Sequence, residues 1–296
     1  MQSFPIQKIF VQGPDFIELT PEHLKEQIDF ANANNVDGFI IGHPWSKKRY
    51  NDLSFLPRNI RGLTISFEAA LDISAINSFH QLEVLHAGMS TPQSAIDLAN
   101  FPTIRVLNIK WDKKYKSLTK LTNTIRLVLW GFKPKSRDLS ELNTFNKLVY
   151  ARLTQPGIDC LDGIENLSKL KELELANVRS LKHFFSDDRL TKAPLEELAF
   201  DLCKNIDINS IPKIETLKVL RFIQIGKQKT LQEILPKFPS LETLIFTQSE
   251  LEDGNLSYLL EHPTLKKVII DHKRHYSLKE KEIQKLLDEK NKKVAD

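Results

Sequence analysis

The residues that could carry out covalent or metal chemistry are few, and they form no familiar catalytic pattern. Cys160 and Cys203 are too few for a disulfide framework, and each lies near an apolar position of a repeated pattern, so we predict reduced, buried thiols. His272 and His275 are not accompanied by a cysteine or carboxylate cluster, and we interpret their segment as a surface loop. The chain contains no G-x-S-x-G, phosphate-loop, H-E-x-x-H or paired-cysteine motif. We therefore predict no enzyme activity, no metal site and no cofactor.

A second group of side chains has the chemistry of recognition. Aromatic residues and arginine commonly anchor protein interfaces, and here they occur on alternate positions of strand-like segments in the middle of the chain. The predicted partner-binding residues are His86, Asn108, Lys110, Trp111, Trp130, Tyr150, Arg152, Glu172, Glu174, Asp201 and Arg221. They predict an aromatic centre with a basic side and an acidic side. The simpler interpretation is a solvated sheet face that keeps the protein soluble.

These side chains must be positioned by a repeat, and its clearest copy is the stretch from Leu161 to Leu175. Its apolar residues are three apart as far as Leu173 and then two apart, which is typical of a coil of short turns that enters a strand. The first apolar residue of each strand-like segment is called its anchor. The anchors are Val36, Ile60, Leu82, Ile104, Ile125, Leu148, Leu170, Leu195, Leu217, Leu241 and Leu265. Their regular spacing predicts eleven parallel strands, stacked over roughly 50 Å.

Two further columns of apolar residues keep the same phase. Three residues before the anchors are Phe79, Phe101, Phe145, Leu167, Ile214 and Phe238. Six residues before them are Phe30, Ile76, Leu98, Leu142, Ile164, Ile211, Leu235 and Leu259. We expect both columns to fill the interior. The phase is ambiguous in one unit, because Ile125, Leu127 and Leu129 also alternate, and either phase leaves Leu129 or Trp130 uncovered.

Segments at both ends of the chain are predicted to cap the repeat array, covering its first and last units. Residues 1–35 do not repeat, and they predict an N-terminal cap of short strands and a helix that starts with Thr20 as its N-cap and Pro21 at its first position. The repeats are assigned to residues 36–276. Residues 277–296 predict a C-terminal capping helix and a frayed tail, because Ser277 and Glu280 have capping-box spacing. Ile283, Leu286 and Leu287 are expected on one face of that helix.

These units resemble the leucine-rich repeat superfamily, and within it the short 22-residue class found in bacterial internalins. The best matches are LHAG at 85–88, LELA at 173–176 and LRFI at 220–223, and the resemblance covers about residues 36–272. It implies an α/β class, right-handed solenoid with parallel strands on a concave face, and a scaffold for protein recognition. The chain departs from the family because the asparagine that normally follows each strand is absent; the positions hold Glu68, Ser90, Asp112, Pro156, Val178, Cys203, Ile225, Ser249 and Lys273.

Two functions are compatible with these features. The first is a non-catalytic scaffold that binds a partner protein on its central concave face, for example a bacterial immunity (antitoxin-like) protein or an adaptor. The second is a nucleic-acid-associated protein that binds phosphates along a basic loop edge, formed by residues 45–50, 111–116 and 132–137. For those loops, the simpler interpretation is solubilising charge over a packed aromatic residue.

Composition describes a folded protein that is only mildly basic. The 296 residues include 42 Lys and Arg against 38 Asp and Glu, which gives a formal charge of +4. This balance does not by itself indicate a nucleic-acid partner. The N-terminus lacks the pattern of a signal peptide, and no apolar run is long enough to span a bilayer. We therefore expect a cytoplasmic protein that does not contact membranes.

Overall fold

The computed structural model describes residues 4–9, 13–42, 50–66, 70, 72–88, 90–185 and 193–295, with side chains as far as residue 292. The chain forms two compact units. The N-terminal unit comprises Met1–Phe132 and Thr144–Leu148, and the C-terminal unit comprises Lys133–Asn143 and Val149–Asp296.

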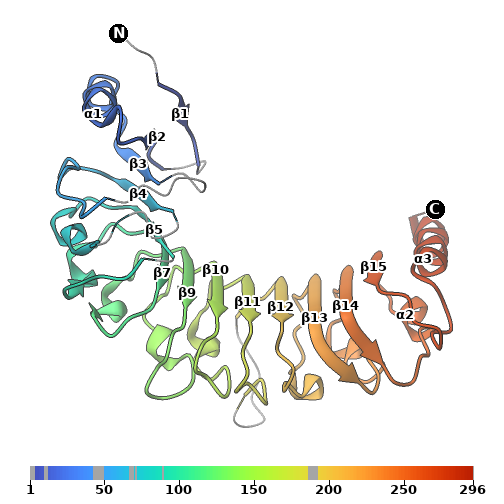
Figure 1. The fold of residues 1–296 in the computed structure, drawn as a ribbon. Helices are drawn as coiled ribbons and strands as arrows, with labels where there is room; N and C mark the ends of the chain where they lie inside the picture. The colour runs from blue at the N-terminus through green and yellow to red at the C-terminus, as the bar shows by residue number, and fades with distance from the viewer. Residues whose placement is uncertain are drawn as a thin grey trace. The chain divides into compact units, whose positions relative to one another are not determined.

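In the N-terminal unit, a parallel sheet carries short turns and one helix beside it (Figure 1). Its strands, in spatial order, are β1 (Ile6–Gln7), β2 (Phe16–Leu19), β3 (Gly38–Ile41), β4 (Gly62–Ile65), β5 (Val84–Ala87), β7 (Val106–Lys110) and β9 (Arg126–Trp130). β1 is antiparallel to β2, and the other pairs are parallel. The remaining elements are α1 (Leu24–Ala33), the small sheet of β6 (Ile96–Asp97) and β8 (Tyr115–Lys116), and the 3-10 turns η1 (Ser74–Ser78), η2 (Leu98–Asn100) and η3 (Leu118–Lys120).

The C-terminal unit repeats the same plan with a helix at its end. Its parallel strands are β10 (Tyr150–Thr154), β11 (Glu172–Ala176), β12 (Glu197–Asp201), β13 (Val219–Gln228), β14 (Thr243–Leu251) and β15 (Lys267–Ile270). The return segments contain η4 (Ser140–Leu142), η5 (Ile164–Asn166), η6 (Ile208–Ser210), η7 (Leu235–Lys237) and α2 (Tyr258–Glu261), and α3 (Glu280–Ala295) packs against β15. Each of the eleven predicted anchors therefore precedes a parallel strand.

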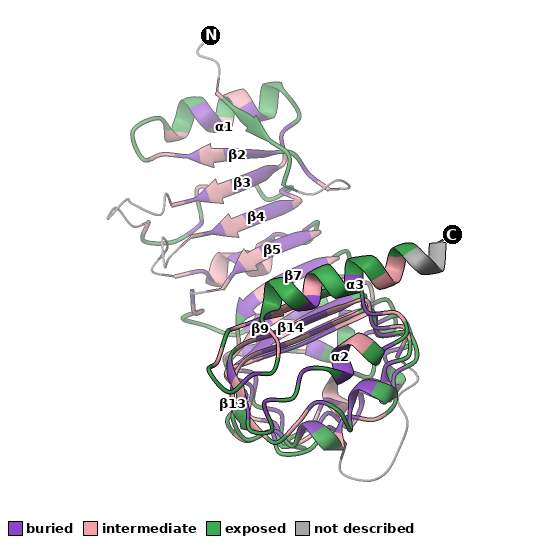
Figure 2. Cartoon of the chain, turned by 90° about the vertical axis from the view of Figure 1, so that its right-hand side faces the viewer, coloured by how far each residue is buried: buried purple, intermediate pink, exposed green. Residues whose placement is uncertain are grey.

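The core lies between the sheet and the return segments. Leu173, Leu198, Leu220 and Leu244 occupy equivalent register positions in adjacent strands and are fully buried. Phe200 and Phe222 stack with ring centroids 5.7 Å apart, so aromatic contacts join neighbouring repeats. The predicted columns before each anchor are buried as well, except that Phe30 is only half-buried. Figure 2 shows buried and partly exposed residues along β2 to β5, as expected for strands with one face on a core.

Two details of the sequence interpretation differ from the structure. The anchor of β9 is Thr124 rather than Ile125, because Arg126 pairs with Val106 and places Leu127 and Leu129 in the core. The fully buried Thr124 is tolerated because its hydroxyl donates to the Ile104 carbonyl at 3.3 Å. The parallel ladder also begins before Val36, since β2 pairs in parallel with β3.

The helices of the two caps differ from the prediction in where α1 begins and in which residues of α3 are buried. α1 begins at Leu24 rather than at the predicted Pro21, because residues 20–23 form a separate turn in which the His23 amide donates to the Thr20 carbonyl. Gln27, rather than a Thr20 cap, ties the helix to β2: its side chain accepts from the Thr20 amide and donates to the Glu18 carbonyl. In α3, Ile283 and Leu287 are buried, but Leu286 is 39% exposed.

The capping box predicted for α3, Ser277 with Glu280, does not form. The Ser277 hydroxyl accepts from the Leu256 amide instead of capping the helix. Glu282 takes part instead, since its carboxylate accepts from the Lys279 amide at 2.7 Å. The helix continues to Ala295, where a frayed tail was predicted, and Lys290 donates to the carbonyls of Leu260 and His262.

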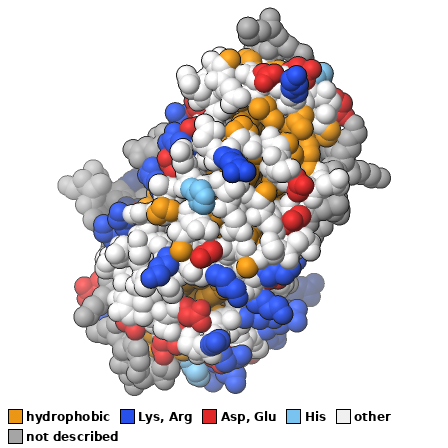
Figure 3. Space-filling model, turned by 90° about the vertical axis from the view of Figure 1, so that its left-hand side faces the viewer, with side chains coloured by type: hydrophobic (Ala, Val, Ile, Leu, Met, Phe, Trp, Pro, Cys, Tyr) orange, Lys and Arg blue, Asp and Glu red, His pale blue; other side chains and the backbone are white. Residues whose placement is uncertain are grey.

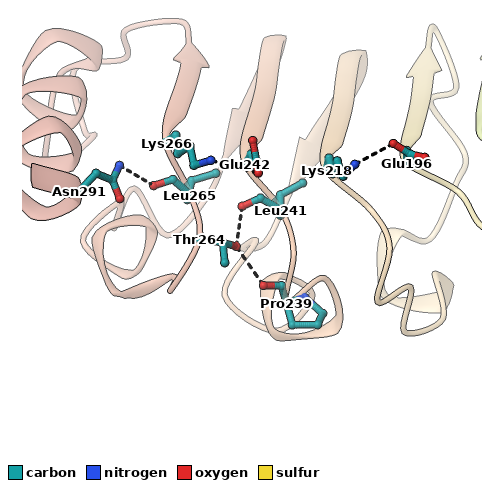
Figure 4. A network of polar contacts seen from close by, with 9 residues as sticks. All are labelled: Glu196, Lys218, Pro239, Leu241, Glu242, Thr264, Leu265, Lys266 and Asn291. Atoms are coloured by element: carbon teal, nitrogen blue, oxygen red, sulfur yellow. Dashed lines mark hydrogen bonds and ion pairs between the residues drawn. The ribbon is translucent and has the colours of Figure 1, made fainter. Parts of the chain in front are cut away.

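Charged side chains immediately before the strands alternate in sign and link the repeats. In the N-terminal unit, Arg61 lies between Asp37 at 3.0 Å and Glu83 at 2.7 Å. In the C-terminal unit, the corresponding residues are Lys171, Glu196, Lys218, Glu242 and Lys266. Figure 4 shows Glu196 beside Lys218 and Glu242 beside Lys266. Thr264 adds hydrogen bonds to the Pro239 and Leu241 carbonyls, so polar side chains join repeats that have no asparagine column.

Replacing Glu196 with Gln is expected to lower the free energy of unfolding by about 1 kcal/mol at pH 7, because Glu196 contacts Lys171 at 2.7 Å and Lys218 at 2.8 Å on a solvent-screened surface. Hydrogen bonds from these lysines lower the pKa of Glu196 from 4.5 to about 2. Since the folded-state pKa is depressed, this stability is present above pH 4.5 and is lost as the pH falls towards 2.

Denaturant titrations of the two proteins between pH 7 and pH 3 test this expectation. Glu233→Gln is the matched control, since Glu233 is exposed and forms no ion pair with a described residue. A wild-type advantage of the same size at pH 3, or one that persists unchanged in molar salt, would contradict the assignment.

Candidate functional site

The face of each sheet that points away from the core is called the open face here, and it corresponds to the predicted concave surface. In the C-terminal unit, strand register defines three rows on this face. The first contains Tyr150, Glu172, Glu197, Val219, Thr243 and Lys267, and the second contains Arg152, Glu174, Ala199, Arg221, Ile245 and Ile269. The third contains Thr154, Ala176, Asp201, Ile223 and Thr247.

A network of ion pairs crosses these rows, with Glu174 at its centre. The Glu174 carboxylate accepts a hydrogen bond from the Tyr150 hydroxyl at 3.1 Å and lies 3.3 Å from the Arg152 guanidinium. Arg221 contacts Glu197 directly, and its Nη2 lies 3.6 Å from Glu174. All four charged residues are partly shielded, with Glu174 21% and Arg221 30% exposed. The network therefore holds two guanidinium groups in fixed positions on rigid strands.

A small residue makes the longest of these contacts possible. Ala199 lies between Glu174 and Arg221 in the same row, on the intervening strand β12. Because its side chain is a methyl group, the Arg221 guanidinium can pass over β12 and approach Glu174 on β11. Ala199 was not predicted on this face, although the register of the strands places it there.

Within this unit, basic side chains flank the acidic ones on both sides, whereas the prediction placed them on one side. Glu174 on β11 and Glu197 on β12 lie between Arg152 on β10 and Arg221 on β13, and each guanidinium pairs with a carboxylate on a neighbouring or next-but-one strand. Tyr150 is also only 6% exposed, so its ring supports the network more than it offers an open contact surface. Truncation of Tyr150 is therefore expected to lower the melting temperature as well.

Two carboxylates and four aliphatic side chains of this face remain outside the network. No ion pair or hydrogen bond joins the carboxylate of Glu172 or Asp201 to another described residue. Val219, Ile223, Ile245 and Ile269 are only partly buried, although they point away from the core. Ile223, Ile245 and Ile269 were missed, because aliphatic residues in a strand are ordinarily assigned to the core when the register is unknown.

In the N-terminal unit, the structure brings Asn108 and Trp130 together around Gly88. A Cβ atom at Gly88 would lie 3.1 Å from Asn108 Oδ1 and 3.7 Å from Trp130 Nε1, so the glycine leaves room for both groups. Among the described residues, neither atom has a hydrogen-bond partner. His86 is adjacent to Asn108 in register, and burial followed by the charge of Arg126 lowers its pKa to about 4. His86 is therefore neutral at pH 7.

Lys110 and Trp111 do not belong to this group. Lys110 is exposed at the end of β7, in register with Trp130. Trp111 stacks on Tyr115 with centroids 6.1 Å apart and meets Phe132 edge-on at 5.5 Å. Its ring therefore packs among loop aromatics beyond the end of the strand, whereas the prediction placed it in the concave centre.

Part of the open face of the N-terminal unit is covered by its own side chains. Val84 and Val106, which precede the core residues Leu85 and Leu107 in their strands, form a buried cluster with Phe16 and the partly buried Ile40. The Phe16 ring lies over Gly62, where a Cβ would come within 2.5 Å of Phe16 Cζ. A larger residue at this glycine would displace the ring, so glycine is required by close packing.

The sequence matches no protein-family model and no curated protein. Solved structures do resemble it. The Drosophila Toll–Spatzle complex aligns with 88% of this chain and 41% of its own, at 11% identity and a TM-score of 0.60. The TLR13–ssRNA13 complex aligns with 79% of this chain and 39% of its own, at 17% identity and a TM-score of 0.53. An internalin of Listeria monocytogenes, InlF, covers 74% of this chain and 77% of its own, at 15% identity and a TM-score of 0.43.

The fold is decided by parallel strands that recur about every 22 residues and by the segments that connect one strand to the next, which lie on the other side of the core. The chain is a leucine-rich repeat solenoid. The predicted resemblance and fold class are thereby confirmed. This chain spans less than half of the Toll and TLR13 chains, and at these identities the likeness concerns the fold alone.

The basic loops of the leucine-rich repeats are partly engaged within the protein. Lys114 Nζ donates to the Pro92 carbonyl at 2.8 Å, and Arg137 forms a two-bond ion pair with Asp159. Tyr115 and Phe132 are buried beneath loop residues. The surface in Figure 3 shows basic side chains interspersed with acidic ones and one area where hydrophobic side chains gather. Residues 45–49 of the first predicted basic loop, including Lys47, lie outside the described residues, as does Glu68.

Among the described residues, no group of three or more His, Cys, Asp or Glu side chains is arranged to hold a metal ion, and no helix could cross a membrane. Cys203 is buried and Cys160 is half-buried, and both thiols are free. Burial raises the pKa of Cys203 to about 11, so this thiol is protonated at pH 7. Cys160 borders a hollow of about 530 Å³ with His183 and Asp159, but burial, the largest influence, raises the pKa of its thiol as well.

Proposed function

We propose that this leucine-rich repeat protein is a non-catalytic scaffold that binds a partner protein on the open face of its C-terminal unit. The observation that carries the proposal is the network of Tyr150, Arg152, Glu174, Arg221 and Glu197 on one rigid sheet. Arginine and tyrosine are frequent interface anchors, and fixed side chains lose little conformational entropy when a partner binds.

The solved relatives support a binding role of this kind without defining its partner. One resembling chain was solved in a complex with the protein Spatzle and another with a single-stranded RNA. We propose a bacterial immunity protein or adaptor in the cytoplasm, and the free thiols of Cys160 and Cys203 fit a reducing compartment. His86, Asn108, Lys110, Trp111 and Trp130 of the N-terminal unit remain proposed contacts as well.

The test is affinity capture from the native cell, followed by titration of the captured protein. Arg152→Ala and Arg221→Ala are each expected to weaken binding about 30-fold, corresponding to roughly 2 kcal/mol. Lys213→Ala is the control, because Lys213 is an exposed cation paired with Glu215 outside the sheet. Its affinity is expected to equal that of the wild type. Partner binding that survives both arginine substitutions would place the site elsewhere.

A salt titration of the same complex separates the two candidate functions. A protein interface with mixed charges is expected to weaken modestly between 50 and 200 mM salt, whereas contacts to several phosphates weaken by orders of magnitude. A steep dependence, together with loss of binding in Lys113→Ala and Lys116→Ala, would support the basic loop edge and a nucleic-acid partner.

A further inference from the structure

We propose that the open face of the C-terminal unit recognises a cationic, aliphatic segment of its partner, with Lys or Arg opposite Glu172 and Asp201 and aliphatic side chains against Val219, Ile223, Ile245 and Ile269. The inference rests on the proposed function, because it assumes that this face binds a protein. It adds the chemistry of the partner, which the repeats alone do not indicate.

The electrostatic half of the argument concerns β10 to β13. Four carboxylates, Glu172, Glu174, Glu197 and Asp201, face two guanidinium groups, Arg152 and Arg221. Both guanidinium groups are already engaged by Glu174 and Glu197. Glu172 and Asp201 retain free carboxylates, and both are partly shielded from water. A partial loss of hydration strengthens their interaction with an arriving cation relative to a fully exposed pair.

The apolar half of the argument concerns β13 to β15. Ile245 is adjacent in register to Arg221 on one side and to Ile269 on the other, and Ile223 is adjacent to Thr247. These side chains point away from the core: Ile269 is the direct neighbour of Ile245, and Val219 and Ile223 lie diagonal to Ile245 on β13, on either side of Arg221. Contiguous apolar surface on the outside of a soluble protein commonly marks a binding site.

The spacing of the two halves constrains the partner. Glu172 lies on β11 and Ile245 lies on β14, so three strand intervals separate them, roughly 14 Å. The partner segment must therefore present its cation and its aliphatic side chains on one surface about that far apart. An acidic segment is disfavoured, because Glu174 and Glu197 already neutralise Arg152 and Arg221, and the carboxylates of Glu172 and Asp201 would repel it.

Three synthetic peptides test the inference by fluorescence anisotropy: one of alternating leucine and lysine, one with glutamate in place of lysine, and one with serine in place of leucine. The leucine–lysine peptide is expected to bind more tightly than either of the others by tenfold or more. The double variant Glu172→Gln/Asp201→Asn and the single variant Ile245→Ser are each expected to weaken this binding about tenfold. Ile269→Ser provides a second apolar test in case Ile245→Ser folds poorly, as judged by circular dichroism.

Glu233→Gln/Glu261→Gln is the matched control, because it removes the same charge from exposed residues outside the open face. This control is expected to bind the leucine–lysine peptide as the wild type does. Equal or tighter binding of the glutamate peptide would overturn the inference, as would leucine–lysine binding that the open-face variants do not change. In either case the proposed function stands if Arg152→Ala and Arg221→Ala still weaken capture of the natural partner, so the two failures are distinguishable.

Discussion

Replacing Leu173 with Asp is expected to unfold the C-terminal unit at room temperature. Leu173 is 1% exposed and lies in the row of core leucines that continues through Leu198 and Leu220. A carboxylate there would be buried among leucine side chains, and the aliphatic contacts that Leu173 makes would be lost. Such a change costs more than about 4 kcal/mol, which approaches the whole stability of many domains.

Circular dichroism and thermal melting measure this effect directly. Lys169→Asp is the matched control, because it introduces the same residue at an exposed position of the same repeat. The control is expected to melt within a few degrees of the wild type. A cooperative Leu173→Asp protein with a nearly wild-type melting temperature would show that the assigned core face of β11 is incorrect.

Replacing Gly163 with Ala is expected to cost roughly 3 kcal/mol of unfolding free energy, although only one methyl group is added. Gly163 has φ of +101°, which disfavours any residue with a Cβ. That Cβ would lie 2.5 Å from the Ser140 amide nitrogen and 2.6 Å from the Leu139 carbonyl carbon. Since both are backbone atoms of the neighbouring repeat, rotation of a side chain cannot relieve the contact.

Gly157→Ala is the matched control for that substitution. Gly157 has no positive φ, and the nearest atom to its Cβ position is the Lys133 Cγ, 3.2 Å away on a flexible side chain. Denaturant titration is expected to show a change below about 1 kcal/mol for this control. Equal effects of the two substitutions would mean that the repeats do not approach each other closely at Gly163.

The sequence by itself determined the repeat, the positions of the eleven predicted strands and most of the core. Leu170, Leu173 and Leu175 show why: a buried position tolerates few residue types, so each copy of the repeat carries the same apolar pattern at the same phase. The absence of an asparagine column was visible as well. The alternating charges before the strands, from Arg61 and Glu83 to Lys218 and Glu242, were present in the sequence but are understood only once neighbouring strands are paired.

Only the tertiary structure decided the register and the composition of the binding face. Thr124 replaced Ile125 as an anchor because a backbone carbonyl from the preceding repeat satisfied its hydroxyl. Arg221 reached Glu174 because Ala199 lies between them. These residues are 20 or more positions apart in the chain, and contacts between repeats depend on which strands are adjacent and in what register. Local hydrophobic periodicity fixes which face a side chain takes, but it does not specify which side chains from other repeats meet it there.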